Sequence, residues 1–179
     1  MPKVIVLFHG ADSAAEPLAE SAASGAESVR FTEVEIRAIG SAESSSDKRR
    51  PRFTSAEDLR SYDGVIMVCC APGAALDEFV RLTDDLGQTL NASSNVVFTV
   101  LGGGETPLLA RVAGLGGILV SAQTAIDLPQ ARASIAGARN AKVVSWVRHA
   151  LSHEQHDHEH HSHEHHDHSH HSHEPRPMA

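Results

Sequence analysis

Five short runs of strand length divide the chain, and segments with helical spacing lie between them. Four of the runs are continuously apolar, as strands buried on both faces are. The fifth run, residues 31–39 (FTEVEIRAI), alternates apolar and polar side chains and predicts an edge strand. The four continuous runs are residues 3–8 (KVIVLF), 64–70 (GVIMVCC), 96–101 (VVFTVL) and 117–122 (GILVSA).

The segments between these runs predict helices. Residues 12–28 are rich in Ala, Glu and Ser, which predicts a helix whose small-residue face packs close to a sheet. Thr54 or Ser55 is placed to cap a short helix with acidic residues in its first turn. The remaining helices are predicted at residues 75–90, from about 106 to 114, and from about 127 to 151.

This alternation of strands and helices predicts an α/β domain over residues 1–151. Parallel strands need helical, right-handed crossovers, so helices must cover both faces of the sheet. Five strands favour a flavodoxin-like three-layer sandwich with a parallel sheet of order 2-1-3-4-5. Ligands of such a sheet bind at the carboxyl ends of the strands, where the strand order reverses between the first and third strands.

Residues 152–179 differ from the rest of the chain, because residues 153–173 contain twelve of its 14 histidines. His-His and His-x-His spacing lets two imidazoles converge on one ion, so the segment predicts binding of Ni, Zn, Co or Cu. An expression tag or solvated low-complexity filler are the alternatives, although Ser, Asp and Glu interrupt every short run. With no apolar residue between Leu151 and Met178, we expect disorder without metal. The predicted ligands are His153, His156, His158, His160, His161, His163, His165, His166, His168, His170, His171 and His173.

Composition excludes several classes of protein. The formal net charge is −8, of which residues 153–179 carry −5, so nucleic acid is not an expected partner. No apolar window is long enough to span a membrane, and no charged segment with a cleavage site precedes the first strand, which favours a cytoplasmic location. Adjacent Cys69 and Cys70 are the only cysteines, and they fit a reducing compartment rather than a disulfide scaffold.

Three segments in order resemble a known family. They are residues 3–8 with the Ala-rich helix that follows, residues 54–66, and Val97–Thr99 followed by Gly102–Glu105. Together they resemble the FMN-dependent NAD(P)H:quinone oxidoreductases of the tryptophan-repressor-binding-protein type. The resemblance implies FMN, NAD(P)H and a homo-oligomer, either dimer or tetramer. The implied cofactor-binding positions are Gly10, Ser13, Ala14, Cys70, Gly102, Gly103, Gly104 and Glu105.

The departures from that family fall on the cofactor loops. Asp12 and Glu16 add negative charge where a phosphate would dock, and Pro17 removes an N–H group. Ser13 and free amides at Gly10 and Ala14 could partly compensate. The loop after the third strand is short, and no aromatic residue is left to stack on a flavin ring. We therefore expect a weakened or lost FMN site.

Two further clusters have alternative interpretations. His9 and the Cys69–Cys70 pair end neighbouring strands, so they could form a soft site for Zn, Cu(I) or Ni. The alternative is a small buried thiol and a strand-capping histidine. The glycines at 102–104 could admit a ligand or only turn the chain, and the basic residues from Lys48 to Arg52 could meet an anion or simply be solvated.

Three functions remain open from the sequence. The first is a metal-handling protein whose body has lost FMN and whose tail stores, buffers or delivers metal. The second is an active FMN-dependent NAD(P)H:quinone oxidoreductase, in which the flavin carries the electrons. The third is a partner-binding domain with neither ligand. No catalytic residue is assigned.

Overall fold

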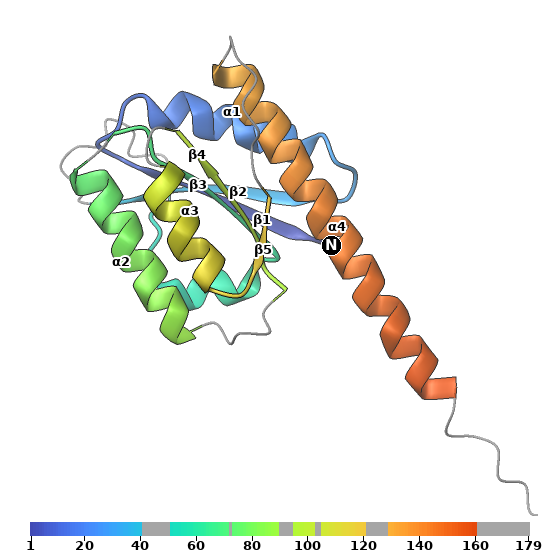
Figure 1. Cartoon of the computed structure of the whole chain (residues 1–179). Coiled ribbons are helices and arrows are strands. Elements are labelled where there is room, and N and C mark those ends of the chain that lie inside the picture. Colours follow the sequence, from blue (N-terminus) through green and yellow to red (C-terminus); the bar gives the residue numbers. More distant parts are fainter. Residues whose placement is uncertain (41–50, 72, 90–94, 103–104, 121–128, 161–179) are drawn as a thin grey trace, which may run out of the picture.

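The computed structural model describes residues 1–40, 51–71, 73–89, 95–102, 105–120 and 129–160, without the side chains of residues 89, 105, 106 and 154–160. Its centre is a parallel five-stranded sheet of order β2-β1-β3-β4-β5, which confirms the predicted order (Figure 1). The strands are β1 (Lys3–His9), β2 (Glu33–Ile39), β3 (Gly64–Val68), β4 (Val97–Leu101) and β5 (Ile118–Leu119).

Helices cover both faces of this sheet. Figure 1 shows α1 and α4 together on one side and α2 and α3 on the other. The elements are α1 (Ala15–Glu27), the 3-10 helix η1 (Ala56–Ser61), α2 (Ala74–Thr89), α3 (Glu105–Gly114) and α4 (Pro129–His160). No described helix combines the length and apolar composition that a membrane crossing needs.

Alternate residues of β1 supply the two halves of the core. Val4, Val6 and Phe8 pack in the cluster that contains the alanines of α1 and α4. Ile5 and Leu7 pack in the cluster that contains the apolar side chains of η1, α2 and α3. Both faces of β1 are therefore buried, as its continuous apolar pattern predicted.

The small-residue face predicted for the first helix is real, and α4 packs against it. A side chain on Gly137 would overlap the carbonyl oxygen of Ala22, and one on Gly25 would overlap that of Ser134. The two backbones are thus in direct contact at these points. The buried alanines of this interface region are Ala15, Ala19, Ala22, Ala23, Ala26, Ala133, Ala136 and Ala141.

Several element ends differ from the predictions, and four of the differences are informative. The first helix starts at Ala15 rather than residue 12, because residues 12–14 form a loop bonded to Asp12. Phe31 precedes β2 with a φ of 64° and is 73% exposed, so it is no strand residue. The fifth strand is Ile118–Leu119, and residues 121–122 of the predicted run lie outside the described part of the chain. The fourth difference concerns the end of α4.

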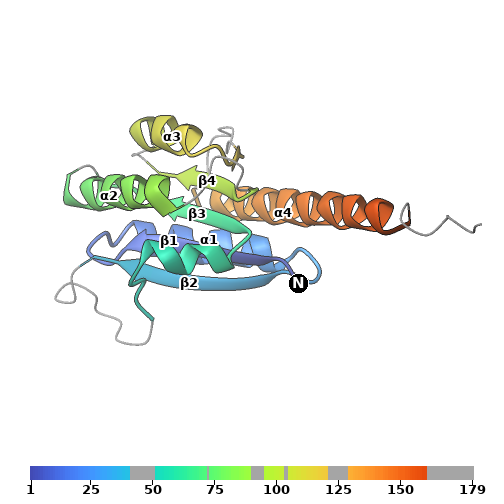
Figure 2. The ribbon, with the colours of Figure 1, turned by 90° about the horizontal axis from the view of Figure 1, so that it is seen from below.

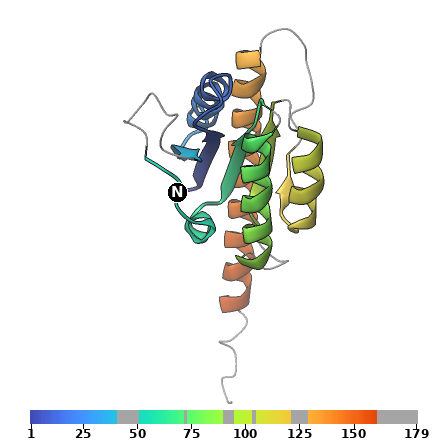
Figure 3. The ribbon, with the colours of Figure 1, turned by 90° about the vertical axis from the view of Figure 1, so that its left-hand side faces the viewer.

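Helix α4 crosses the domain boundary predicted at residue 151. Helix α4 continues to His160, so residues 152–160 are helical. Figures 2 and 3 show this end of α4 running past the sheet. Helix continues because Ser, His, Glu, Gln and Asp include no Gly or Pro that would end it. Residues 161–179 lie outside the described part of the chain.

Tyr62, the only tyrosine, joins η1 to the edge strand. Its hydroxyl donates a hydrogen bond of 2.8 Å to Glu35, and Arg37 donates to the same carboxylate oxygen. The hydrogen bond from Tyr62 is the main cause that lowers the pKa of Glu35. Burial, and then the bond to Glu35, raises the pKa of Tyr62 to about 12.

We expect ultraviolet titration of the native chain to show phenolate forming near pH 12 rather than near 10. Because the folded pKa is the higher one, the contribution of Tyr62 to stability is complete below the unfolded pKa and is lost as pH rises through the folded pKa. Glu35 has the opposite sign, and its contribution fades as pH falls through its lowered pKa. A native phenol that ionises at the same pH as the urea-unfolded chain would rule this out.

Candidate ligand site at the carboxyl edge of the sheet

The strand order reverses between β1 and β3, so the loops after these strands define the expected ligand position. The first loop runs from Gly10 to Ala14, the second from Cys69 to Ala71, and Gly102 follows β4 beside them. The edge therefore assembles segments that are far apart in the sequence.

The Asp12 side chain ties the first two loops together. One carboxylate oxygen accepts hydrogen bonds from the backbone amides of Cys70, at 3.0 Å, and Ala71, at 2.9 Å. The other accepts from the amide of Ala14 at 3.2 Å. Asp12 is only 8% exposed. A carboxylate buried in this way satisfies three donors that would otherwise be available to a bound anion.

The amides of Gly10, Ala11 and Asp12 in the first loop, and that of Ala15 after it, also have partners within the chain. Gly10 donates to the carbonyl of Ile39 at 3.0 Å, and Ala11 donates to His9 Nδ1 at 3.2 Å. The amide of Asp12 donates to His9, and the amide of Ala15 donates to the carbonyl of Asp12. The expectation that Gly10 and Ala14 offer free amides is therefore wrong, because Ile39 and Asp12 already accept their hydrogens.

His9 points toward α2 at the end of β1. Its Nε2 atom lies 2.8 Å from a carboxylate oxygen of Glu78, while its Nδ1 atom accepts from Ala11. Gly40 leaves the space for this pair, because a Cβ there would lie 2.7 Å from His9 Nε2 and 2.8 Å from the same Glu78 oxygen. Its φ of 99° also favours glycine. His9 is thus engaged with a carboxylate rather than a metal.

The two cysteines are poor candidates for metal ligands in this structure. Cys69 is fully buried and its thiol contacts the carbonyl of Ala71 at 3.5 Å. Burial, and then the negative charge of Asp12, raises the pKa of both thiols to about 11. A thiolate is the form that binds metal. Within the described part of the chain, no group of three or more His, Cys, Asp or Glu side chains could hold an ion.

We expect both thiols of the native chain to react slowly with Ellman's reagent at pH 8. A pKa of about 11 leaves roughly 100-fold less thiolate than a pKa of 9. Greater nucleophilicity offsets part of this, so the reaction should be at least about ten-fold slower than in the guanidinium-unfolded chain. Asp12→Asn should accelerate labelling of Cys70, the more exposed thiol. Equal native and unfolded rates would contradict the assigned environment.

Gly102 has a structural requirement that explains its identity. It adopts a φ of 101°, and a Cβ there would overlap the backbone carbonyl of Cys69. The chain after β4 therefore passes directly against the loop after β3. Gly103 and Gly104 lie outside the described residues, and Glu105 is the first residue of α3. The glycine run was expected either to admit a ligand or to let the chain turn. At residue 102, close packing against Cys69 accounts for glycine without a ligand.

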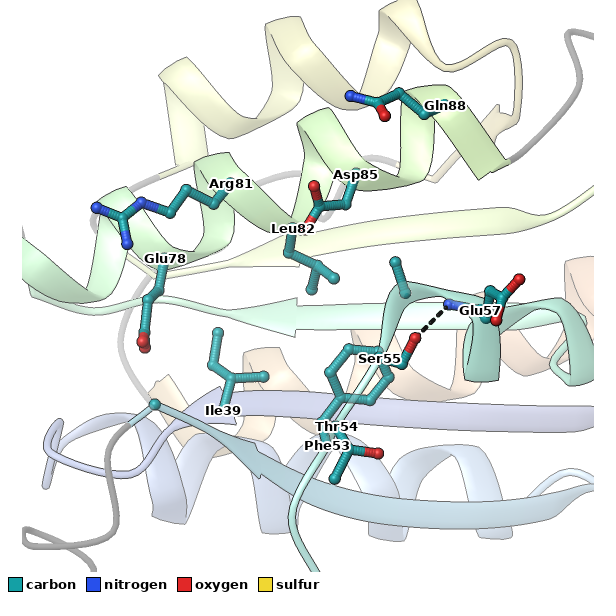
Figure 4. A pocket seen from close by; sticks show the side chains of 12 residues that line it. Ile39, Phe53, Thr54, Ser55, Glu57, Glu78, Arg81, Leu82, Asp85 and Gln88 are labelled. Atoms are coloured by element: carbon teal, nitrogen blue, oxygen red, sulfur yellow. Dashed lines mark hydrogen bonds between the residues drawn. The ribbon is translucent and has the colours of Figure 1, made fainter.

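A cavity that sequence analysis did not predict lies beside His9 and Glu78. Its volume is about 600 Å³, and it is bounded by the end of β2, the segment 53–57 and one side of α2. Figure 4 shows Glu78, Arg81 and Asp85 of α2 across from Ile39 and Phe53. Three remote segments build it, so no local pattern could have indicated it. The full lining is Ile39, Gly40, Phe53, Thr54, Ser55, Ala56, Glu57, Glu78, Arg81, Leu82, Asp85 and Gln88.

The predicted histidine ligands are only partly covered by the structure. His153 is described with its side chain and is exposed on α4. The backbone of His156, His158 and His160 belongs to the same helix. The other eight predicted ligands, from His161 onward, lie outside the described part of the chain.

Comparison with known proteins supports the fold. No protein-family model matches the chain, and no curated protein matches it. The two-electron reduced flavodoxin of Megasphaera elsdenii is 14% identical with a TM-score of 0.53, over 76% of this chain and 98% of that one. The flavodoxin of Streptococcus pneumonia TIGR4 is 14% identical with a TM-score of 0.54, over 78% and 97%. The chain therefore has a flavodoxin-like fold.

Proposed function

We propose that this protein handles divalent transition metals. In this proposal, a flavodoxin-like domain related to FMN-dependent NAD(P)H:quinone oxidoreductases has a weakened or lost FMN site. The histidine-rich C-terminal segment binds Ni, Zn, Co or Cu for storage, buffering or delivery. The weakened or lost FMN site is inferred from the hydrogen bonds that the Asp12 carboxylate accepts from the backbone amides of Ala14, Cys70 and Ala71.

FMN fits the described loops poorly. A phosphate at a helix N-terminus is held by free amides, and the amides of Gly10, Ala11, Asp12, Ala14 and Ala15 all have acceptors within the chain. A phosphate dianion would also face the buried carboxylate of Asp12, and like charges at short range repel strongly in a low-dielectric site. The fold is suited to flavin, whereas these residues oppose its phosphate.

The C-terminal segment supports the second half of the proposal. Imidazole is the commonest protein ligand for late first-row divalent ions. Twelve histidines within residues 153–173 give several pairs with chelating spacing. Within the described residues, no group of three or more His, Cys, Asp or Glu side chains could hold an ion.

Equilibrium dialysis against nickel tests this function. We expect the full chain to bind several equivalents of nickel. A full-length variant with the histidines of residues 156–173 replaced by glutamine should lose most of them. His9→Gln serves as the matched control and should leave the nickel stoichiometry unchanged. Unchanged stoichiometry in the glutamine-substituted variant would show that the segment is not the metal-binding part.

The second candidate is an active FMN-dependent NAD(P)H:quinone oxidoreductase, and the flavodoxin-like fold favours its flavin-related part. It requires FMN to bind despite Asp12. Titration of the full chain with FMN, followed by quenching of flavin fluorescence, distinguishes the two functions. Saturation at one FMN per chain with micromolar or tighter affinity would favour the oxidoreductase, and the absence of saturation would favour the metal-handling function.

A further inference from the structure

Two histidines face each other on the exposed surface of α4, at the end of the folded domain. The ring centroids of His149 and His153 are 4.5 Å apart, with an interplanar angle of 86°. Their Nε2 atoms are separated by 3.1 Å. Both side chains are exposed to solvent. Residues four apart on a helix lie on the same face, so this juxtaposition follows from the sequence spacing.

The separation of the two nitrogens matches that of two ligands on one ion. With a metal–nitrogen distance of about 2.0–2.1 Å, two imidazole nitrogens are about 2.9 Å apart at a right angle and about 3.3 Å apart at a tetrahedral angle. The observed 3.1 Å lies between these values. We propose that His149 and His153 form a two-imidazole site for a divalent transition ion.

This site rests on the proposed function and makes it more specific. Sequence analysis placed the first ligand at His153 and left out His149, which lies before the histidine-rich segment. The structure groups the two residues on one helix. The chelating segment would then begin with a site of fixed geometry on the folded domain, with its other coordination positions open to water or to an exchangeable ligand.

The helix around His149 is held firmly against the body. Arg148 donates a hydrogen bond of 2.9 Å to Asp63 and another to the backbone carbonyl of Met1. Val144 and Val147 of the same helix are buried, at 1% and 9% exposure. The ligand pair therefore starts from an ordered helix, which lowers the conformational entropy that metal binding must overcome.

A hydrogen bond between neutral imidazoles is the competing explanation for the contact. An exposed hydrogen bond of this kind contributes little, because water replaces either partner at small cost. A bound ion would displace the shared proton and engage both nitrogens. The two explanations differ in one respect that can be measured, which is whether metal binding at this place requires His149.

Trp146 provides a local signal for that measurement. It is the only tryptophan in the chain and is 69% exposed. It lies three residues before His149 on α4, where helical side chains are neighbours. Paramagnetic Ni²⁺ bound by the pair should therefore quench its fluorescence, while nickel bound far along the segment should not.

The experiment is a nickel titration of the full chain, monitored by tryptophan fluorescence, with dialysis for total metal. In His149→Gln we expect the nickel concentration for half-maximal quenching to rise at least about ten-fold, because one arm of the chelate is lost. Total bound nickel should fall by about one equivalent. His149 is exposed, so the substitution should leave the fold intact, which circular dichroism checks.

The control is His149→Gln combined with Lys142→His, which restores the histidine count without the four-residue spacing to His153. It should behave like His149→Gln. Quenching at the same nickel concentration in the parent and His149→Gln would overturn the site while leaving metal binding by the segment intact. Full recovery in the double variant would overturn the requirement for this spacing. A parent chain that binds no nickel would overturn the proposed function as well.

Discussion

Asp12→Ala is expected to destabilise the domain by about 2–3 kcal/mol and to create a binding site for inorganic phosphate. The substitution leaves the amides of Ala14, Cys70 and Ala71 without their carboxylate acceptor. Buried donors that lose a charged partner cost roughly this amount, reduced here by access of water to the half-buried loop. Thermal unfolding with and without phosphate measures both effects.

Phosphate should raise the melting temperature of Asp12→Ala and leave that of the parent unchanged. Asp77→Ala is the charge-matched control, since it removes an exposed carboxylate from the first turn of α2 without touching these loops. It should neither lose comparable stability nor gain a phosphate response. If phosphate stabilises the parent as strongly as Asp12→Ala, the Asp12 carboxylate does not prevent an anion from binding at these amides.

Gly137→Ala should produce one of the two largest losses of stability among alanine substitutions of the described glycines in helices, the other being Gly25→Ala at the same helix contact. The new methyl group would overlap the backbone carbonyl of Ala22, and backbone cannot rotate away as a side chain can. Overpacking a core costs about 1–3 kcal/mol and occasionally more, and a clash between two helix backbones belongs at the upper end. Urea denaturation measures the change in the free energy of unfolding.

Gly87→Ala is the matched control, because Gly87 lies within α2 and its added Cβ would make only an ordinary contact, 3.5 Å from Leu115. Alanine has the higher helix propensity, so this variant should be neutral or stabilised by up to about 1 kcal/mol. A Gly137→Ala variant as stable as Gly87→Ala would mean that α1 and α4 are farther apart than described.

The strand order was predictable because the apolar runs of β1, β3 and β4 mark strands buried on both faces. The run at residues 117–122 is the exception, since Ile118 is half-buried and Leu119 is exposed. The position of Asp12 in the first loop also indicated a poor phosphate site. Its actual role depends on Cys70 and Ala71, which are 58 and 59 residues away in the sequence. No local sequence pattern indicates a hydrogen bond between residues so far apart. The bond from the Gly10 amide to the carbonyl of Ile39 is also long-range, so the sequence did not indicate it either.

The predicted domain boundary at residue 151 rests on composition, which changes sharply at residue 152, whereas helix α4 continues to His160. A boundary at residue 151 separates His149 from His153, although these two residues lie one helical turn apart. Asp63 accepts hydrogen bonds from the amide of Lys3 and from Arg148, and no local pattern around Asp63 indicates either contact. The roles of Asp12 and Asp63 both depend on contacts between elements that are distant in the sequence, which a local pattern does not contain.

We propose that this flavodoxin-like domain excludes the phosphate of FMN while its C-terminal segment binds metal. The most direct test incubates the untagged full chain with excess FMN and nickel, removes unbound ligand by desalting, and records absorbance and metal content. We predict bound nickel and no flavin spectrum. One flavin retained per chain, with or without nickel, would contradict the claim.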